Sequence, residues 1–317
     1  MKIFIVGGAG YIGSHMVKIA HKAGHDVITL DNLSTGHQDA VLYGEFELCD
    51  ILDTAKLDKL FKKHKPGAVM HFSAYSLVGE SMTNPYKYYN NNVSGTLSLL
   101  KAMIDNDCMK FIFSSSAAIF GNPEYIPIDE SHPKNPINPY GRSKLMVEEM
   151  LKDFEFAYGL KYISFRYFNA AGHDPDGELS ERHDPETHLL PIIMQAANGQ
   201  RDLVSIFGND YDTNDGTCVR DYIHVNDLAE AHIKGLEYLN SNELHITEFN
   251  LGNGNGFSVK EVIQKVKDIS GKDFMVIEKG RRDGDPSILI ASDKKAKKFL
   301  KLKANFSKIE EIIQTLN

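Results

Sequence analysis

Residues 3–15 read IFIVGGAGYIGSH, and this stretch decides the fold. Four apolar residues come before a run of glycines, and the apolar pattern that continues through Val17 and Ile19 predicts a helix directly after that run. Glycines lack a Cβ atom, so they permit a tight turn and let a pyrophosphate approach the backbone amides at the positive end of a helix. A glycine run alone is weak evidence, but the strand and helix around it favour a dinucleotide site.

An acidic residue follows at the distance that such a site requires. Asp31 lies 18 residues after Gly13, at the end of the strand predicted over residues 27–30. A carboxylate there accepts hydrogen bonds from ribose hydroxyls and repels a 2′-phosphate, and residues 32–35 contain no arginine. The pattern favours NAD over NADP as the cofactor; a turn formed by Asp31 with Asn32 is the alternative.

Short apolar runs alternate with helical patterns through the first half of the chain. The runs that indicate buried strands are residues 3–6, 27–30, 68–72, 111–114 and 162–165. Continuous apolar strands between helices predict a doubly wound parallel sheet of the α/β class, covered on both faces. With 317 residues, the chain has room for about two domains.

The alternation of apolar runs and helical patterns is lost in the second half of the chain. Residues 170–188 are polar and lack periodicity, and residues 258–261 form a capping box before an apolar helical stripe that ends at Gly271. The division that we predict is a Rossmann domain over 1–169 and a smaller α/β substrate-binding lobe over 170–317, with segments around 219–235 returning to the Rossmann domain.

The amino-acid composition argues against some classes of binding partner and against some cellular compartments. Lysine and arginine number 35 and aspartate and glutamate 43, a net charge of −8, which argues against nucleic acid as a partner. Three cysteines without a C-x-x-C pair predict neither a disulfide framework nor a thiolate zinc site. The apolar start is too short for a signal peptide, and no run reaches the ~18 residues of a membrane span, so we expect a cytoplasmic protein without membrane contact.

A tyrosine and a lysine share one face of a predicted helix. Residues 138–144 read NPYGRSK, which places Tyr140 and Lys144 four residues apart on that face. Use of Tyr140 as a base near neutral pH requires stabilising its phenolate by about 4 kcal/mol, and a nearby ammonium supplies the right charge. Ser116, at the end of the fourth predicted strand, is placed to relay the proton. A surface helix after a strand-end turn is the alternative.

These motifs and several others follow one order over most of the chain. Besides residues 7–15, 31–33, 111–117 and 140–144, they are YNNNV at 89–93, RYFN at 166–169, FGNDY at 207–211 and RDYIHV at 220–225. With this series the chain resembles the extended short-chain dehydrogenase/reductase family, and within it most closely the UDP-glucose 4-epimerases. The resemblance implies reversible C4 epimerisation of UDP-galactose and UDP-glucose through a transient 4-keto intermediate and NADH, with Tyr140 as the base.

The resemblance also implies which residues act. Ser116, Tyr140 and Lys144 match the family's catalytic residues. The implied NAD contacts are Gly7, Gly10, Tyr11, Ile12, Gly13, Asp31, Asn32, Asp50, Ile51, Phe72, Ala74, Asn92, Tyr140, Lys144 and Tyr167. The implied UDP-sugar contacts are Ser116, Tyr140, Asn169, Leu189, Phe207, Arg220, Arg282, Asp285 and, in the sugar pocket, Leu289. Members of the family dimerise through helices near residues 93–103 and 145–151, so we expect a homodimer.

Four positions depart from the family pattern. Val6 stands in place of a threonine and Phe120 in place of a tyrosine, so two hydroxyls are missing, and Ser76 stands where some members place a lysine near the cofactor. Leu289 stands where relatives carry either a bulky aromatic or a small residue, which leaves UDP-N-acetyl sugars open as substrates.

Three alternative functions stay open. A nucleotide-sugar 4,6-dehydratase or decarboxylase begins with the same oxidation, but dehydratases of this family carry an acidic pair where this chain has Ala117 and Ala118. A non-catalytic NAD-sensing regulator would be expected to have lost the tyrosine or the lysine. A metal enzyme is suggested by polar residues that match no zinc spacing, so we predict no metal site; they are His173, His183, Asp184, Glu186 and His188.

Overall fold

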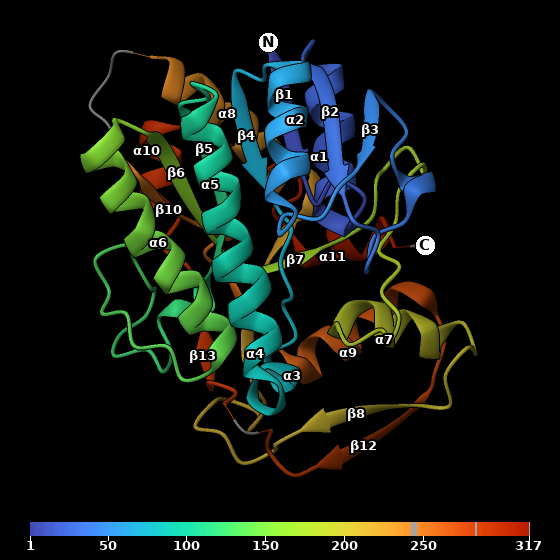
Figure 1. Ribbon diagram of the computed structural model, residues 1–317. Coiled ribbons are helices and arrows are strands. Elements are labelled where there is room, and N and C mark those ends of the chain that lie inside the picture. Colours follow the sequence, from blue (N-terminus) through green and yellow to red (C-terminus); the bar gives the residue numbers. More distant parts are fainter. Residues whose placement is uncertain (242–245, 283, 317) are drawn as a thin grey trace.

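The structure is a computed structural model, and it describes residues 1–241, 246–282 and 284–316. Its centre is a seven-stranded sheet in the order β10-β6-β5-β4-β1-β2-β3, with every neighbouring pair parallel (Figure 1). All five predicted strands are confirmed, each to within two residues. The strands are β1 (Lys2–Val6), β2 (Asp26–Asp31), β3 (Glu45–Leu48), β4 (Ala68–His71), β5 (Lys110–Ser116), β6 (Lys161–Tyr167) and β10 (Glu248–Leu251).

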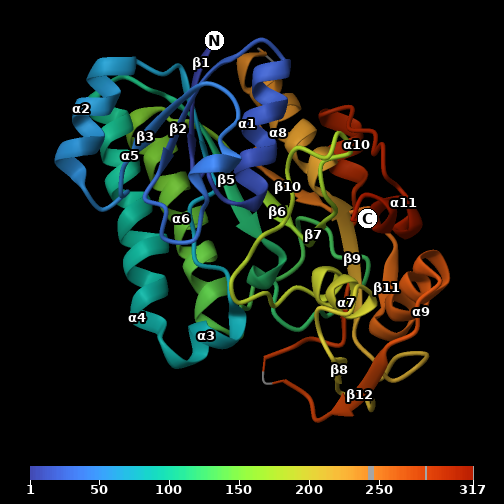
Figure 2. The ribbon, with the colours of Figure 1, turned by 90° about the vertical axis from the view of Figure 1, so that its right-hand side faces the viewer.

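Helices cover both faces of this sheet, which explains the apolar runs in its strands, such as residues 3–6 of β1. Ile3 and Ile5 of β1 pack under the helices of one face, and Phe4 and Val6 under those of the other. Figure 2 shows helices on both sides of the sheet. The doubly wound α/β fold is therefore confirmed. The covering helices are α1 (Tyr11–Lys22), α8 (Val225–Asn240) and α10 (Lys294–Phe299) on the first face, and α2 (Thr54–His64), α5 (Thr96–Asp105) and α6 (Pro139–Tyr158) on the second.

One helical stretch changes its pitch on the way to the sheet. After α3 (Val78–Thr83), the short helix α4 (Pro85–Tyr88) continues through residues 89–95 as a π-helical segment and then into α5. Such π-helical turns are frequent at functional sites, because they redirect side chains that a regular helix would place elsewhere.

Across the described ranges, we find no helix with both the length and the apolar character that crossing a bilayer requires.

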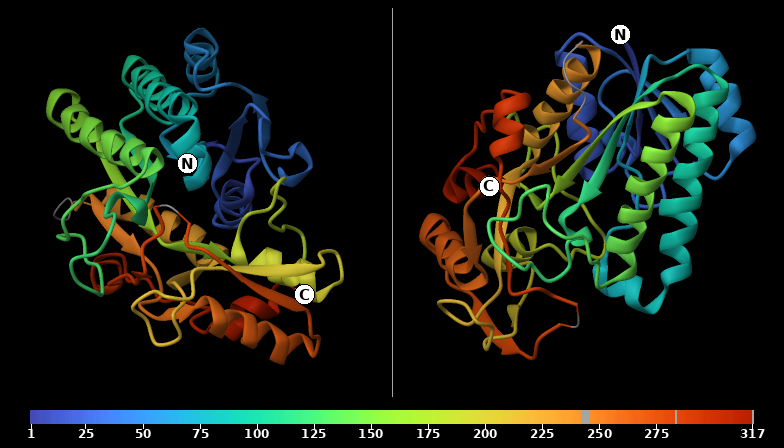
Figure 3. Two further views of the ribbon diagram at one scale, coloured as in Figure 1. Left: turned by 90° about the horizontal axis from the view of Figure 1, so that it is seen from below. Right: turned by 90° about the vertical axis from the view of Figure 1, so that its left-hand side faces the viewer.

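A smaller lobe lies below the sheet in Figure 1, and Figure 3 shows it from below and from the other side. It has its own apolar core. The predicted capping box is confirmed: the Ser258 side chain accepts from the Glu261 amide, the Glu261 carboxylate accepts in return, and Gly271 ends the helix with a φ of 66°. The lobe's elements are β7 (Asn169–Ala171), β9 (Val219–His224), β11 (Gly256–Ser258) and β13 (Ile288–Leu289) in one sheet, the parallel pair β8 (Leu203–Phe207) and β12 (Met275–Lys279), and helices α7 (Leu189–Ala197), α9 (Val259–Ser270) and α11 (Ile309–Gln314).

The chain crosses between the sheet and the lobe several times. Strand β9 pairs within the small sheet, whereas α8, which starts directly after it, packs against α1 on the central sheet. Strand β10 then joins the edge of the central sheet beside β6, with Phe249 opposite Phe165, a pairing that the sequence analysis did not predict. Each lobe is thus built from several separate stretches of sequence.

A buried ion pair fastens α6 to the central sheet. Arg166 of β6 donates from Nε and Nη2 to the two carboxylate oxygens of Glu148 at 2.9 and 2.8 Å, and both side chains are at most 1% exposed. The Ser115 hydroxyl of β5 donates to the same carboxylate at 2.6 Å. Glu148 thus joins α6 to β5 and β6 directly beside the strand end that carries Ser116.

Glu148→Gln is expected to lower the free energy of unfolding by about 3 kcal/mol, because it leaves the Arg166 charge buried beside a neutral partner. The matched control is Glu149→Gln, an exposed neighbour whose ion pair with Lys152 contributes less than about 1 kcal/mol. Urea unfolding followed by circular dichroism compares the two variants. Equal losses in both would contradict the structural role of Glu148.

Candidate active site

A cavity of about 1270 Å³ opens where the central strands end. Its walls come from both lobes: the ends of β2 and β5 and the loops after β1 and β4 form one side, and strands β8 and β9 contribute to the other. In open parallel sheets, ligands bind outside this carboxyl edge. The cavity is therefore the place to look for the predicted site residues.

The glycine loop between β1 and α1 is packed too tightly for side chains. A Cβ atom on Gly13 would lie 2.1 Å from the Gly7 carbonyl oxygen. One on Gly7, whose φ is +81°, would lie 2.5 Å from the backbone nitrogen of Ser73. Gly10, the N-cap residue of α1, lines the cavity. The loop thus leaves the start of α1 accessible to an anionic group, as a dinucleotide pyrophosphate requires.

Asp31 connects the end of β2 to this loop. Its Oδ2 accepts a hydrogen bond from the Ala9 amide at 3.0 Å, and its Oδ1 accepts one from the Leu33 amide at 2.8 Å. Burial raises the pKa of the carboxyl, and these backbone donors partly offset the rise. The carboxylate also lines the cavity, so it faces the place that the sequence pattern assigns to a ribose.

Most of the predicted ligand contacts line this one cavity. They are Gly7, Gly10, Tyr11, Ile12, Gly13, Asp31, Asn32, Phe72, Ala74, Ser116, Tyr140, Lys144, Tyr167, Asn169, Leu189, Phe207, Arg220, Arg282, Asp285 and Leu289. Asp50, Ile51 and Asn92 are not among the residues that line the cavity. Asp50 accepts from Asn32 Nδ2 at 2.8 Å, and Asn92, on the π-helical segment, donates to the Tyr75 carbonyl and the Ser143 hydroxyl.

Ser116, Tyr140 and Lys144 meet at the end of β5. The Asn138 side chain caps α6 by accepting from the Gly141 amide at 2.8 Å, so the helix begins just before Tyr140. A Cβ on Gly141 would lie 2.3 Å from the Ala118 carbonyl oxygen, which shows how closely the helix approaches the residues after β5. Lys144 Nζ donates to the Ser114 carbonyl at 2.7 Å and lies 5.9 Å from the centre of the Tyr140 ring.

Burial opposes ionisation of both titratable groups. It raises the pKa of Tyr140, while a hydrogen bond with Ser116 lowers it in part. It lowers the pKa of Lys144 to about 7. Because an ammonium stabilises a nearby phenolate and a phenolate stabilises a nearby ammonium, charge on either group favours charge on the other.

Tyr167 is fixed by polar contacts close to Lys144. Its hydroxyl lies 2.7 Å from both the Ser114 hydroxyl and His232 Nε2. Burial lowers the pKa of His232 to about 4, so this imidazole is neutral at physiological pH. The same Ser114 accepts from Lys144 through its carbonyl. Tyr167 therefore supports the position of Lys144 as well as lining the cavity.

Cationic and aromatic groups gather at the other end of the cavity. Arg220 of β9 forms an ion pair with Asp285 and donates to the Val219 carbonyl at 2.9 Å. The Arg282 guanidinium lies 3.7 Å from the centre of the Phe207 ring. Planar guanidinium groups bind diphosphates through paired hydrogen bonds, and an aromatic ring offers a surface for a base.

Two of the family departures meet in one apolar cluster. Phe120 is 1% exposed and packs with Ile119 and Ile128, and Leu289 lies against the same cluster. A phenylalanine therefore suits position 120, since a tyrosine hydroxyl in such a cluster would need a buried partner.

The sequence analysis missed several residues of the cavity wall. Lys279, at the end of β12, lies 5.8 Å from the Phe207 ring because β12 pairs with β8 in a register that sets Lys279 opposite Phe207. Glu181 also lines the cavity, together with His183, Glu186 and His188. The long polar segment that contains these four gave the only signal, since segments of that kind are usually functional.

Comparison with known proteins places the chain among enzymes. Residues 3–252 match the model of the NAD dependent epimerase/dehydratase family. The chain belongs to this family. A UDP-glucose 4-epimerase of Halalkalibacterium halodurans is 49% identical over 99% of this chain and 94% of its own length. This relative supports the membership that the motif order indicated.

Solved structures resemble this epimerase/dehydratase family member along its full length. The UDP-glucose 4-epimerase of Brucella ovis in complex with NAD has a TM-score of 0.96 at 48% identity, covering 99% of this chain and 96% of that one. The UDP-glucose 4-epimerase of Bifidobacterium longum in complex with NAD⁺ and UDP has a TM-score of 0.95 at 35% identity, with the same coverage.

Lys144→Met is expected to stabilise the cofactor-free protein at pH 6. The pKa of Lys144 is about 7 when folded and ~10.4 when unfolded, so its burial destabilises the fold fully below pH 7 and less and less as pH rises toward 10. Relative to wild type, the variant should gain about 1–2 kcal/mol at pH 6 and clearly less at pH 9. Urea unfolding at both pH values measures the gain.

The matched control is Lys152→Met, which removes an exposed lysine from the same helix. Its effect should be the same at pH 6 and pH 9. If the Lys144→Met effect were equally independent of pH, the lowered pKa of Lys144 would be wrong.

Proposed function

We propose that this chain is an NAD-dependent UDP-glucose 4-epimerase that interconverts UDP-galactose and UDP-glucose by oxidation and re-reduction at C4 of the sugar. One observation carries the proposal: Ser116, Tyr140 and Lys144 share a single cavity with the glycine loop and with Arg220. The three relatives named above are UDP-glucose 4-epimerases, and the two solved structures among them contain NAD, one of them with UDP; they support the same activity.

The residues of the first domain fit NAD. Gly7 and Gly13 make the loop that a pyrophosphate can approach, and Asp31 provides the acceptor for ribose hydroxyls. NAD, when bound, supplies a reversible acceptor for the hydride of C4. Because the reaction ends with the cofactor in its starting state, the protein gains from holding it throughout the cycle.

Tyr140 acts as the base in this proposal. Its phenolate removes the proton of the sugar 4-hydroxyl, directly or through the Ser116 hydroxyl, and the phenol returns the proton after the sugar has turned. Lys144 stabilises the phenolate by its charge, which offsets the effect of burial on the pKa of Tyr140. Burial also keeps competing water away from the transferred proton.

The other lobe holds the nucleotide rather than the sugar. In our proposal Arg220 and Arg282 bind the diphosphate, Phe207 contacts the base, and Asn169 and Leu189 complete the wall. Leu289, in the sugar pocket, offers no polar group to fix the ring. A firm hold at the diphosphate with few sugar contacts lets the 4-ketose present either face to the cofactor, which epimerisation requires.

The residues after Ser116 argue against a 4,6-dehydratase. Elimination needs an acid to protonate the leaving group at C6, and Ala117 and Ala118, which occupy those positions, line the cavity without a titratable group. The paired Tyr140 and Lys144 likewise favour an enzyme over an NAD-sensing regulator.

The activity is tested by giving the purified protein UDP-galactose and, separately, UDP-N-acetylgalactosamine without added NAD. Chromatography should show conversion of UDP-galactose to UDP-glucose without a change in mass. The second substrate shows whether Leu289 leaves room for an acetamido group. No conversion of either sugar by protein with bound NAD would overturn the proposal.

Tyr140→Phe should lower the epimerase turnover by about 10²–10⁴-fold, since it removes the base and leaves the packing. Tyr158→Phe is the matched control, because Tyr158 is an exposed tyrosine at the far end of the same helix. Turnover is followed by the same chromatographic assay. Full activity of the Tyr140 variant would exclude this residue as the base.

We further propose a homodimer that forms through α5 and α6. Leu97 on α5 and Met146 on α6 are 47% and 45% exposed, although both side chains are large and apolar. Figure 1 shows the two helices next to each other along one side of the sheet. Large apolar side chains exposed on neighbouring helices are typical of a protein interface.

Light scattering should give twice the chain mass of 35.5 kDa. The double variant Leu97→Asp with Met146→Asp should be monomeric, because it would bury four unpaired carboxylates in a symmetric interface. Leu42→Asp changes an equally exposed leucine elsewhere and should stay dimeric. A monomeric wild type would contradict the proposal.

A cytoplasmic location fits the cysteines. All three, Cys49, Cys108 and Cys218, are free thiols with buried side chains, as expected in a reducing compartment. We therefore propose the cytoplasm as the site of action.

A further inference from the structure

The polar segment of residues 172–188 lies across the start of α1 and is fastened to the first domain at several points. The Tyr11 hydroxyl donates to the Gly172 carbonyl, and Arg182 forms a two-point ion pair with Asp39 at 2.9 Å for each bond. Further back, Lys18 of α1 pairs with Asp174, Asp176 and Glu178. The segment is therefore an ordered part of the cavity wall.

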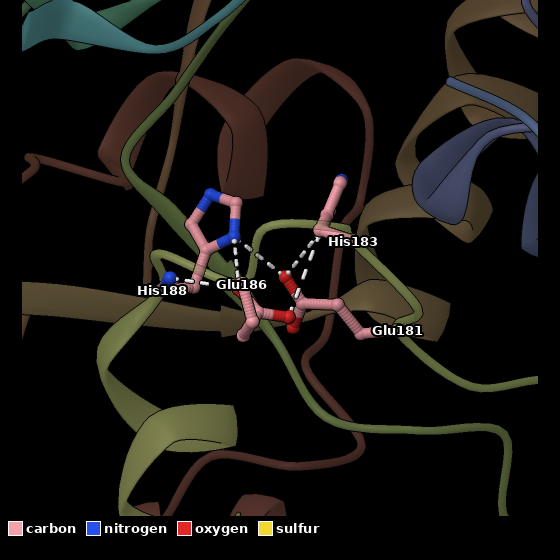
Figure 4. A group of neighbouring side chains, drawn as sticks. All are labelled: Glu181, His183, Glu186 and His188. Atoms are coloured by element: carbon pink, nitrogen blue, oxygen red, sulfur yellow. Dashed lines mark hydrogen bonds and ion pairs between the residues drawn. The ribbon is translucent and has the colours of Figure 1, made fainter.

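Four potential metal ligands come together on this segment. One nitrogen or oxygen atom from each of Glu181, His183, Glu186 and His188 lies within 4.8 Å of every other. Figure 4 shows the four side chains turned toward one another. Both imidazoles approach the carboxylates through Nδ1. Such a convergence of two imidazoles and two carboxylates is a donor set that suits zinc.

The distances from each imidazole to the carboxylates are near those between neighbouring ligands of a tetrahedral site. His188 Nδ1 lies 2.8 Å from Glu181 Oε1 and 3.2 Å from Glu186 Oε1. His183 Nδ1 lies 3.1 Å from Glu181 Oε1 and 3.9 Å from Glu186 Oε2. Four ligands bound to zinc at about 2.0–2.1 Å are separated by roughly 3.3 Å, so small adjustments bring these atoms to a shared ion.

The carboxylates lack another strong cationic partner. The Glu181 and Glu186 side chains are only 1% and 4% exposed, and Glu181 Oε2 is buried without a hydrogen-bond partner among the described residues. Within the described chain, neither forms an ion pair with a lysine or arginine. Two other clusters of acidic residues do have a lysine partner. Lys18 pairs with the cluster of Asp174, Asp176 and Glu178. Lys63 pairs with Glu47, which lies beside His64.

The surroundings add to the need for positive charge. The Tyr11 ring, in the first turn of α1, lies 6.1 Å from the His183 ring, so the two carboxylates lie near the place where the dinucleotide phosphates are expected. Buried anions require a compensating cation. A dication with two neutral imidazoles would balance both carboxylates fully.

We propose that Glu181, His183, Glu186 and His188 bind one zinc ion, which fastens the segment of residues 172–188 over the glycine loop. Four protein ligands fill a tetrahedral zinc site, so the ion is structural and takes no part in the epimerase chemistry. Two imidazoles favour zinc over magnesium or calcium, which prefer oxygen ligands. This site replaces our sequence-based expectation of no metal, which rested on the lack of a known zinc spacing.

The site also differs from the residues that the sequence suggested for a metal. Glu181 joins it, whereas His173 and Asp184 stay outside the group. The His173 amide is bound to the Thr315 hydroxyl, and Asp184 is exposed. The spacing E-x-H-x-x-E-x-H places the four ligands on one turn-rich segment.

The test begins with protein stripped by EDTA, incubated with zinc chloride and dialysed against metal-free buffer. Inductively coupled plasma mass spectrometry should find about one zinc ion per wild-type chain. His188→Gln and Glu181→Gln should lose most of this zinc. Asp184→Asn, which changes an exposed carboxylate between the ligands, should keep it. Zinc should raise the thermal midpoint of the wild type and of Asp184→Asn, and leave the two ligand variants unchanged.

A wild-type chain that retains no zinc would overturn the proposal and identify the cluster as a protonated ion-pair network. So would zinc retained equally by wild type and both ligand variants, which would place the ion elsewhere. Cobalt gives a check that does not need a variant: the wild type should show the strong visible absorption of a tetrahedral Co²⁺ site, and its absence would also count against the proposal. None of these readouts depends on epimerase activity.

Discussion

The position of helix α6 on the carboxyl end of β5 is the constraint on which the proposed chemistry depends. The Glu148–Arg166 ion pair fixes the middle of the helix to β5 and β6, and the close approach of Gly141 to the Ala118 carbonyl fixes its start. Tyr140 and Lys144 stand between these two contacts, four residues apart on one face. A helix displaced by one residue would point neither side chain at Ser116.

This arrangement places charge where a folded protein usually avoids it. Lys144 is buried beside the phenol that it serves, and burial works against the charged form of each. Two large apolar clusters, one on each face of the central sheet, stabilise the fold around the site. Stability is thus supplied by residues remote from the proposed catalytic residues, and Lys144 lowers it, as is common for active-site groups.

Local features of the sequence were enough to predict much of the fold and site. The glycine loop, the Asn138 start of α6 and the capping box at Ser258 each depend on neighbours within a few residues, and such patterns can be recognised from sequence. Asp31 could be recognised because it follows Gly13 by 18 residues, at the end of the next strand. Arg220 and Arg282 carry no such pattern; only the resemblance to a family singled them out.

Features that depend on distant pairing could not be predicted. Strand β10 has four residues and becomes a strand because β6 offers it an edge. Lys279 meets Phe207 only through the pairing of β12 with β8. Glu181 joins its three partners because the segment 172–188 is fastened at both α1 and residue 39. In each case the deciding contact involves residues far apart in the chain.

The repeated passage of the chain between the lobes has a mechanical consequence. At His224 the small sheet ends and helix α8 of the large layer begins, and the chain crosses again between β10 and β11 and between β13 and α10. A two-lobed protein with one linker can open like a hinge, but here every crossing would have to bend together. We expect the lobes to behave as one rigid body, so that during turnover the sugar turns while the walls around it keep their spacing.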